Sequence, residues 1–175
     1  MQALKINKMA IRVSVNYNDQ RWKRFDLTRY VTILVSKVFQ IHQIKLNDFS
    51  LSVLACSDFK IKELNRQYRR KNKATNILAW PAVHCYLNPD QDHLYYEKNN
   101  YFFLGDIAIS YERCLREASF YNIHFNRYCC KLLAHGILHL LGYDHDISVK
   151  TQRMQLMETR ILNSVLTNRP KLDII

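Results

Sequence analysis

The chain has 175 residues, 48% of them hydrophobic, which is enough to build a core and excludes a disordered or disulfide-dependent chain. No apolar run reaches the roughly 20 residues that a membrane-spanning helix needs, so we expect no membrane partner. The net charge is +11, and all of the excess lies in residues 1–80, where sixteen Lys and Arg stand against five Asp and Glu. Such a one-sided field suits a polyanion, with RNA or DNA as first candidates and a merely solvated basic surface as the alternative.

The organisation of the chain predicts one domain over residues 1–175, because there is no internal repeat, low-complexity tract or Pro/Gly-rich linker. The five cysteines are Cys56, Cys85, Cys114, Cys129 and Cys130. They form no Cys-x-x-Cys pair and their number is odd, so we interpret them as reduced packing residues. The N-terminus lacks the apolar block and cleavage site of a secretory signal, and we expect a cytoplasmic protein.

The first elements alternate between strand and helix. Apolar and polar side chains alternate over residues 10–17, which predicts a strand. Apolar side chains recur at helical spacing over 28–39, which predicts a helix with Thr28 as its N-cap. Residues 48–57 are largely apolar, as expected of a buried central strand.

A second helix is predicted over residues 57–73, and either Ser57 or Asp58 can cap its start. Its apolar face carries Ile61, Leu64 and Tyr68. Another face carries a basic stripe formed by Lys62, Arg66, Arg69, Arg70 and Lys73. This stripe is the densest part of the positive first half.

The second half begins with a short strand over 75–81, stopped by Pro81. Residues 82–103 lack clear periodicity, so we expect a long surface loop or an irregular hairpin, followed by a strand over 104–110. Three helices follow, over 110–121 with Ser110 as its cap, over 126–141 and over 148–166. The middle one is apolar on most sides and is expected to be the buried central helix. About four strands and five helices in this order predict an α/β or α+β fold.

The segment HGILHLLGYDH places three histidines around the end of that central helix. His135 and His139 are four residues apart, so on a helix they share one face with side chains about 6 Å apart. Gly142, just past the helix, can adopt a left-handed conformation and turn the chain back, which lets His145 reach the same centre. We predict that these three histidines bind one metal ion.

Three imidazoles suit Zn²⁺ best, although other divalent first-row metals also fit. Three protein ligands leave a fourth position for water, which is typical of catalytic zinc. Asp144 is a candidate hydrogen-bond acceptor behind one ligand, and Gly136 and Gly142 are interpreted as flanking the ligand-bearing helix. The alternative is that the histidines are ordinary side chains satisfied by hydrogen bonds. Zinc proteases have the general base Glu where this chain has Gly136, which argues against peptide hydrolysis.

HGILHLLGYDH resembles the signature H-G-x-L-H-L-x-G-Y-D-H of the YbeY endoribonuclease family, the rRNA maturation factors. Residues 64–81 are similar to a second block of that family, and LGDIAIS at 104–110 resembles its L-G-D-I-x-I-S strand. In the second block, Asn72, Ala74 and Trp80 depart from the family's usual Asp, Pro and Phe. The resemblance covers residues 50 to 160 in outline.

The resemblance implies a hydrolase that holds one metal through His135, His139 and His145 and depends on an essential arginine, which here is Arg69. It implies an α/β fold in which a mixed sheet packs with helices and the metal lies in a cleft. It also implies cleavage of single-stranded RNA, with roles in maturing the 3′ end of small-subunit rRNA and in ribosome quality control. The partners expected from it are single-stranded RNA or rRNA and the ribosome or its small subunit, with no DNA.

The chemistry of the residues agrees with this implication. A metal can polarise a phosphoryl oxygen, and a guanidinium can clamp the non-bridging oxygens in a bidentate manner, for which Arg69 is our candidate. The remaining basic residues, expected to contact flanking phosphates, are Lys62, Arg66, Arg70, Lys71 and Lys73. Attack by water is preferred over attack by the RNA 2′-OH.

Several alternatives stay open. Tyr68 and Trp80 either stack on bases or belong to the core. Asp106 is either structural or a hydrogen-bond partner of the metal ligands. At the level of function, the protein is either the endoribonuclease described above, a non-catalytic rRNA-binding assembly factor with a structural zinc, or a metallohydrolase with another substrate.

Overall fold

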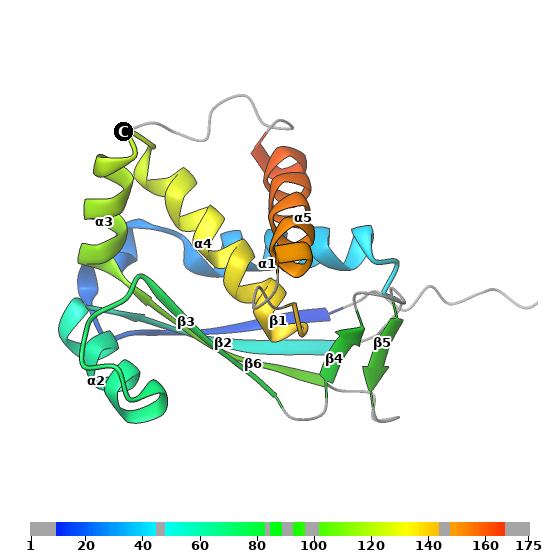
Figure 1. Ribbon diagram of the computed structural model, residues 1–175, viewed down its shortest axis with the longest axis horizontal. Coiled ribbons are helices and arrows are strands. Elements are labelled where there is room, and N and C mark those ends of the chain that lie inside the picture. The colour runs from blue at the N-terminus through cyan, green and yellow to red at the C-terminus, as the bar shows by residue number, and fades with distance from the viewer. Residues whose placement is uncertain are drawn as a thin grey trace, which may run out of the picture.

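The computed structural model describes residues 10–44, 48–82, 85–88, 93–96, 102–143 and 148–166. These residues form a four-stranded mixed sheet, five α-helices and a separate two-stranded sheet (Figure 1). The predicted α+β class and the predicted numbers of helices and main-sheet strands are confirmed. In this part of the chain, no helix has the length and apolarity required to cross a membrane.

The main sheet contains, in spatial order, β1 (Ala10–Tyr17), β2 (Asp48–Cys56), β6 (Phe102–Ser110) and β3 (Ile77–Pro81). β1, β2 and β6 run parallel, and β3 is antiparallel to β6. β2 is therefore an interior strand, as its apolar sequence predicts. β6 begins two residues before the predicted start.

The smaller sheet pairs β4 (Cys85–Asn88) with β5 (His93–Tyr96) in antiparallel register. It lies within the segment for which the sequence left a surface loop or an irregular hairpin open. The strand pairing favours the hairpin.

The helices are the short 3-10 helix η1 (Gln20–Arg24) and the α-helices α1 (Leu27–Ile41), α2 (Asp58–Arg69), α3 (Tyr111–Phe120), α4 (Phe125–Leu140) and α5 (Ser148–Leu166). The prediction of Thr28 as the cap of α1 is wrong. Asp26 occupies that position, and its carboxylate accepts a hydrogen bond from the Arg29 N–H at 3.1 Å. Asp26 stands immediately before the first buried leucine of the helix, where a capping carboxylate satisfies an otherwise unpaired N–H.

α2 is capped by Ser57, one of the two predicted residues, but it ends at Arg69. The predicted end at residue 73 is wrong because Arg70 adopts a left-handed conformation with φ of 57°. Buried Asn65 then holds the following segment by donating a hydrogen bond to the Lys73 carbonyl at 2.7 Å. The basic stripe is therefore split, with its last members in the segment after the helix.

Ser110 precedes α3, as predicted, but its side chain makes no capping hydrogen bond. Its hydroxyl instead donates to Asp58 Oδ1 at 2.5 Å, which ties the start of α2 to the end of β6. Burial alone raises the pKa of Asp58, but the hydrogen bonds from Ser110 and Arg116 outweigh it and lower that pKa below its ordinary value.

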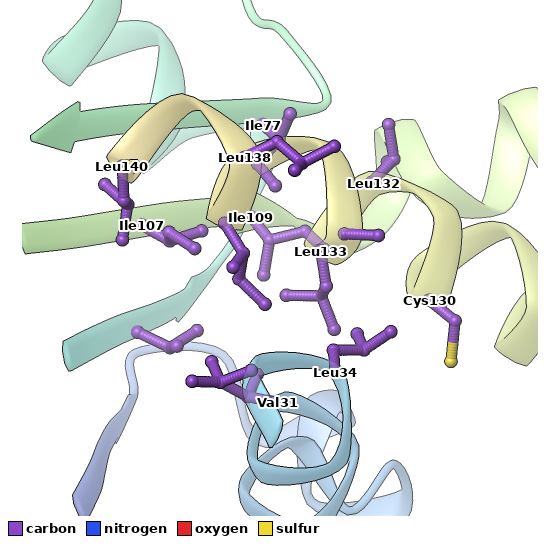
Figure 2. Close-up of a cluster of buried hydrophobic side chains, with 14 of the residues drawn as sticks. Val31, Leu34, Ile77, Ile107, Ile109, Cys130, Leu132, Leu133, Leu138 and Leu140 are labelled. Atoms are coloured by element: carbon purple, nitrogen blue, oxygen red, sulfur yellow. The ribbon is translucent and has the colours of Figure 1, made fainter. Parts of the chain in front are cut away.

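The two faces of the main sheet are covered by different numbers of helices. Figure 1 shows α1, α3, α4 and α5 on one face of the main sheet and α2 on the other. α4 is the central helix, as predicted, because it is buried on most sides. Figure 2 shows side chains of α4, such as Leu133, meeting Ile109 of β6 and Leu34 of α1 in one apolar cluster. Cys129 and Cys130 are buried in the same core.

Gly136 lies inside α4, so its predicted place at the edge of the helix is wrong. A Cβ atom at this position would lie 3.0 Å from Ile77 Cδ1 and 3.3 Å from Ile107 Cδ1, closer than ordinary contacts. The absence of a side chain lets α4 approach β3 and β6 closely, and so fixes the height of His135 above the sheet.

The substitution Gly136→Leu is expected to lower the free energy of unfolding by about 1–3 kcal/mol, because added methylene groups overpack a filled site. Urea denaturation followed by circular dichroism measures this change. Arg127→Leu, at an exposed position of the same helix, is the matched control and should stay within about 0.5 kcal/mol of wild type. Equal midpoints for wild type and Gly136→Leu would contradict the close packing.

Candidate functional site

His135 and His139 lie side by side on one face of α4, near its C-terminal end. Their Nε2 atoms are 3.0 Å apart, and the ring planes are nearly perpendicular, with centroids 4.5 Å apart. The i, i+4 spacing thus brings two of the three predicted ligands together. His145 and Asp144 lie outside the described residues.

The other nitrogen of each ring contacts an acceptor. His135 Nδ1 donates to Glu158 Oε1 at 2.7 Å, and His139 Nδ1 donates to the Tyr143 carbonyl at 2.9 Å. A backbone carbonyl and a carboxylate accept hydrogen bonds, so both Nδ1 atoms are held as donors and the Nε2 atom of each ring is turned toward the other ring. The two Nε2 atoms are therefore the nitrogens placed to hold a cation.

This arrangement fits two ligands of a metal ion. Histidines that bind metals usually present one nitrogen while an acceptor holds the other. Two nitrogens at about 2.0–2.1 Å from a tetrahedral zinc lie about 3.3 Å apart, close to the separation of the Nε2 atoms. Within the described ranges, no group of three His, Cys, Asp or Glu side chains is gathered for a metal.

The turn after α4 positions the acceptor for His139. Gly142 has a φ of 88°, the left-handed conformation predicted for it. The Tyr143 N–H donates to the Leu138 carbonyl at 3.0 Å, which brings the chain back over the last turn of the helix. The Tyr143 ring is buried, and its hydroxyl lies 3.1 Å from His42 Nε2. The backbone N–H and the side-chain hydroxyl of Tyr143 are thus both held by contacts, while its carbonyl accepts a hydrogen bond from His139.

A cavity of about 610 Å³ borders the histidine pair and Arg69, the last residue of α2. Arg69 is exposed, and its guanidinium makes no ion pair with any carboxylate of the described part of the chain. Among the described residues that line the cavity, none is Asp or Glu. An uncompensated guanidinium beside two imidazoles suits an anionic ligand.

Tyr68 and Trp80 also line this cavity. Their rings meet edge to face, with centroids 5.5 Å apart, and Tyr68 is 59% exposed. The interpretation of Tyr68 as a core residue is therefore wrong, because it presents its ring to solvent beside the histidines.

The other basic residues predicted to bind RNA do not line the cavity. All are exposed, on α2 or just after it: Lys62, Arg66, Arg70, Lys71 and Lys73. They surround Arg69 in the sequence without reaching the histidine pair.

Asp106 does not contact His135 or His139. Its neighbour Ile107 faces α4 beneath Gly136, and successive side chains of a strand point to opposite faces. Asp106 is exposed and lines a separate cavity with Ser14 and Ser52 on the other face of the sheet. Its interpretation as a partner of the metal ligands is wrong.

Glu158, which contacts His135, is a candidate site residue that the sequence analysis missed. It occupies the stripe of α5 that also carries buried Met154, Ile161 and Val165. A carboxylate at such a position needs a buried partner, which here is His135. That carboxylate within an apolar helical stripe was the available indication of its role.

Comparison with known proteins identifies the family of the chain. The family model described as Endoribonuclease YbeY matches residues 13–166. The chain is 35% identical over 161 residues to the Endoribonuclease YbeY of Paracoccus denitrificans, covering 92% of this chain and 90% of the relative. It is 33% identical over 156 residues to that of Ruegeria sp., covering 87% and 92%.

A structure determined in solution for a Thermotoga maritima protein has a similar fold, with a TM-score of 0.52. The two chains are 21% identical, and the match covers 94% of this chain and 99% of the other. At this identity the likeness supports the fold alone. The family model and the relatives carry the assignment, and the chain belongs to the endoribonuclease YbeY family.

Proposed function

We propose that this protein is a metal-dependent endoribonuclease that cleaves single-stranded RNA. Its proposed role is the maturation of the 3′ end of small-subunit rRNA and ribosome quality control in the cytoplasm, with the ribosome or its small subunit as partner. The relatives' shared name, Endoribonuclease YbeY, supports the activity.

One observation carries the proposal: the Nε2 atoms of His135 and His139 lie 3.0 Å apart, beside a cavity that the Arg69 guanidinium also borders without an ion pair to any described carboxylate. A phosphodiester carries a negative charge, and its transition state gathers more charge on oxygen. The site thus combines a place for a cation with a positive group for the phosphate.

His135 and His139 would hold the metal together with the predicted third ligand His145. Zinc is the proposed ion; when bound, it supplies a Lewis acid that draws charge from a phosphoryl oxygen or from water. Glu158 and the Tyr143 carbonyl keep both rings in the orientation that leaves Nε2 for the ion.

Arg69 binds the non-bridging phosphate oxygens as a planar bidentate donor. Tyr68 and Trp80 offer aromatic surface for an unpaired base beside that phosphate, which favours single strands. The exposed basic residues around Arg69 contact flanking phosphates, so binding weakens as salt rises. Water is the proposed attacking group.

The test uses purified full-length protein, whose metal content is measured first. Labelled single-stranded and double-stranded RNAs are then incubated with it, with and without a chelator. We expect cleavage of the single strand, loss of cleavage with chelator, and recovery when zinc is restored. Products ending in a 2′,3′-cyclic phosphate would identify the RNA 2′-OH as the attacking group.

Protein that retards the RNA on a gel but leaves it intact under every metal condition would overturn the proposed activity. It would support the non-catalytic assembly factor instead. His139→Ala is the matched variant, since it removes one predicted ligand and leaves Arg69 and the basic surface in place.

A further inference from the structure

A second cavity, of about 420 Å³, lies beside the histidine pair. It borders α4 from Tyr128 to His135, whereas the first cavity borders α4 from His135 onward. Asn76, Ile77 and His135 line both cavities, so the two meet at the proposed metal centre. We name this second space the α4–α5 cavity, because Thr151, Gln155 and Glu158 of α5 form its opposite wall.

We propose that the α4–α5 cavity binds the nucleotide adjacent to the cleaved phosphodiester, on the side opposite the nucleotide held beside Arg69. This inference rests on the proposed function and adds the path that the RNA strand takes across the site. The strand would follow the exposed side of α4, with His135 between the two nucleotides.

The walls of the α4–α5 cavity suit a flat ring. Its apolar lining is formed by Ile77, Ile123, Leu132 and Met154. Tyr121, which is 59% exposed, presents a second aromatic surface and stacks on Tyr128 with ring centroids 6.2 Å apart and planes inclined by 25°. An exposed aromatic ring above an apolar floor is the kind of surface on which bases stack without regard to sequence.

Two polar side chains at the α4–α5 cavity have no partner within the part of the chain that the structure describes. Lys131 is exposed, makes no ion pair there, and lies one helical turn before His135 on the same face of α4. The Gln155 amide is exposed and makes no side-chain hydrogen bond there, so it offers both a donor and an acceptor. A cation for phosphate, an amide for a base edge and a ring for a base face are the three groups that a nucleotide needs.

The cavity is held in shape by its own hydrogen bonds. The Tyr128 hydroxyl and the Asn76 amide both donate to Glu117 Oε2, at 2.6 Å and 2.8 Å. Burial and the bond to Glu117 raise the pKa of Tyr128 above its usual value, so the hydroxyl stays a donor at neutral pH. The wall beneath Tyr121 is thus formed before any ligand binds, which reduces the cost of ordering.

The test measures steady-state cleavage of a short single-stranded RNA by full-length, metal-loaded protein. Lys131→Ala and Tyr121→Ala are each expected to raise KM about five- to tenfold with little change in kcat, since they remove binding away from the reacting bond. Lys131→Ala should also reduce the slope of log affinity against log salt by about 1. Gln155→Ala should weaken the base preference at one position next to the cut, read by sequencing the products.

Matched control variants distinguish a loss of binding at the α4–α5 cavity from a general loss of charge or of folding. Tyr121→Phe keeps the ring and Lys131→Arg keeps the charge, so both should behave like wild type. Lys23→Ala removes an exposed cation from η1, outside the cavity, and should leave KM unchanged. The substituted side chains are exposed, and circular dichroism should confirm that each variant is folded.

The outcomes distinguish this inference from the proposed function. Wild-type KM in both Lys131→Ala and Tyr121→Ala, with RNA still cleaved, would overturn the second nucleotide site alone. If wild type binds RNA without cleaving it, the same five- to tenfold ratio is read from the dissociation constant, and its presence would still support the site. Wild type that neither binds nor cleaves RNA would overturn both.

Discussion

Arg69→Ala is expected to lower kcat for RNA cleavage about 10²- to 10³-fold, while the protein stays folded and keeps its metal. The magnitude is that of removing one preorganised positive group from a developing oxyanion. Arg69 reaches the cavity of the histidine pair, and no carboxylate of the described part of the chain lines that cavity to neutralise it. Nothing else among the described lining residues replaces its charge there, since the remaining basic residues around α2 lie outside the cavity.

The controls for Arg69 follow from its geometry. Arg69→Lys keeps the charge but loses the planar fork, so it should recover only part of the lost rate. Arg29→Ala removes an exposed arginine of α1, outside the cavity, and should leave kcat unchanged. Single-turnover cleavage with saturating protein separates kcat from binding. A folded, metal-loaded Arg69→Ala protein that cleaves at the wild-type rate would remove this residue from the mechanism.

The features predicted well from sequence depend on residues close together in the chain. The strand at 10–17 follows from alternation of side chains, and the pairing of His135 with His139 follows from the pitch of a helix. The turn at Gly142 is predictable, because a glycine directly after an apolar helix commonly adopts the left-handed conformation observed there. Local rules are sufficient for each of these.

The end of α2 shows where local rules fail. Arg70 adopts a left-handed φ, a conformation that glycine or asparagine usually adopts. Because an arginine stands at this position, the sequence does not indicate that the helix ends there. The hydrogen bond from buried Asn65 to the Lys73 carbonyl holds the turn from within the fold. A side-chain hydrogen bond between residues eight apart in the chain therefore stabilises the turn where the sequence pattern continues the helix.

In the candidate site, too, local motifs predict some residues, whereas others depend on contacts made by the fold. The sequence predicts the metal ligands and Arg69 through their motifs, and it proposed Asp144, next to the ligands in the chain, as an outer acceptor. Asp144 lies outside the described residues, and the acceptors that the structure describes are Glu158 on another helix and the backbone carbonyl of Tyr143. A carbonyl has no signature in a sequence, and Glu158 is distant from the histidine motif. The two alternatives for Asp106 could not be decided from the sequence, because the face to which its side chain points depends on how β6 packs under α4.

Glu158→Gln is expected to weaken zinc binding about 10- to 100-fold without changing the fold. The carboxylate accepts from His135 Nδ1 at 2.7 Å and is 12% exposed, so its negative charge raises the basicity of the ring with little screening by solvent. Glutamine has nearly the same shape and can still accept one hydrogen bond, so the variant removes mainly the charge. Competition with a chromophoric chelator measures the dissociation constant directly, without relying on activity.

Glu63→Gln is the matched control, because Glu63 is an exposed carboxylate on α2 that pairs only with Lys60 among the described residues. It should leave zinc affinity unchanged. Glu158→Ala is expected to exceed the effect of Glu158→Gln, since it leaves the His135 N–H without an acceptor and a space at the α4–α5 contact. Zinc binding by Glu158→Gln at wild-type affinity would show that the ring orientation is set by other contacts.

The same hydrogen bond links zinc binding to the docking of α5. A ligand that binds only the folded state stabilises it by RT ln(1 + [L]/Kd), so each tenfold loss of affinity removes about 1.4 kcal/mol of zinc-induced stabilisation at a fixed excess of metal. Zinc should therefore raise the melting temperature of Glu158→Gln less than that of wild type. The melting temperatures of metal-free wild type and metal-free Glu158→Gln should differ much less. Without a bound cation, a more basic His135 ring adds little to the stability of the folded state. A melting-temperature difference that is equally large with and without zinc would assign Glu158 to packing alone.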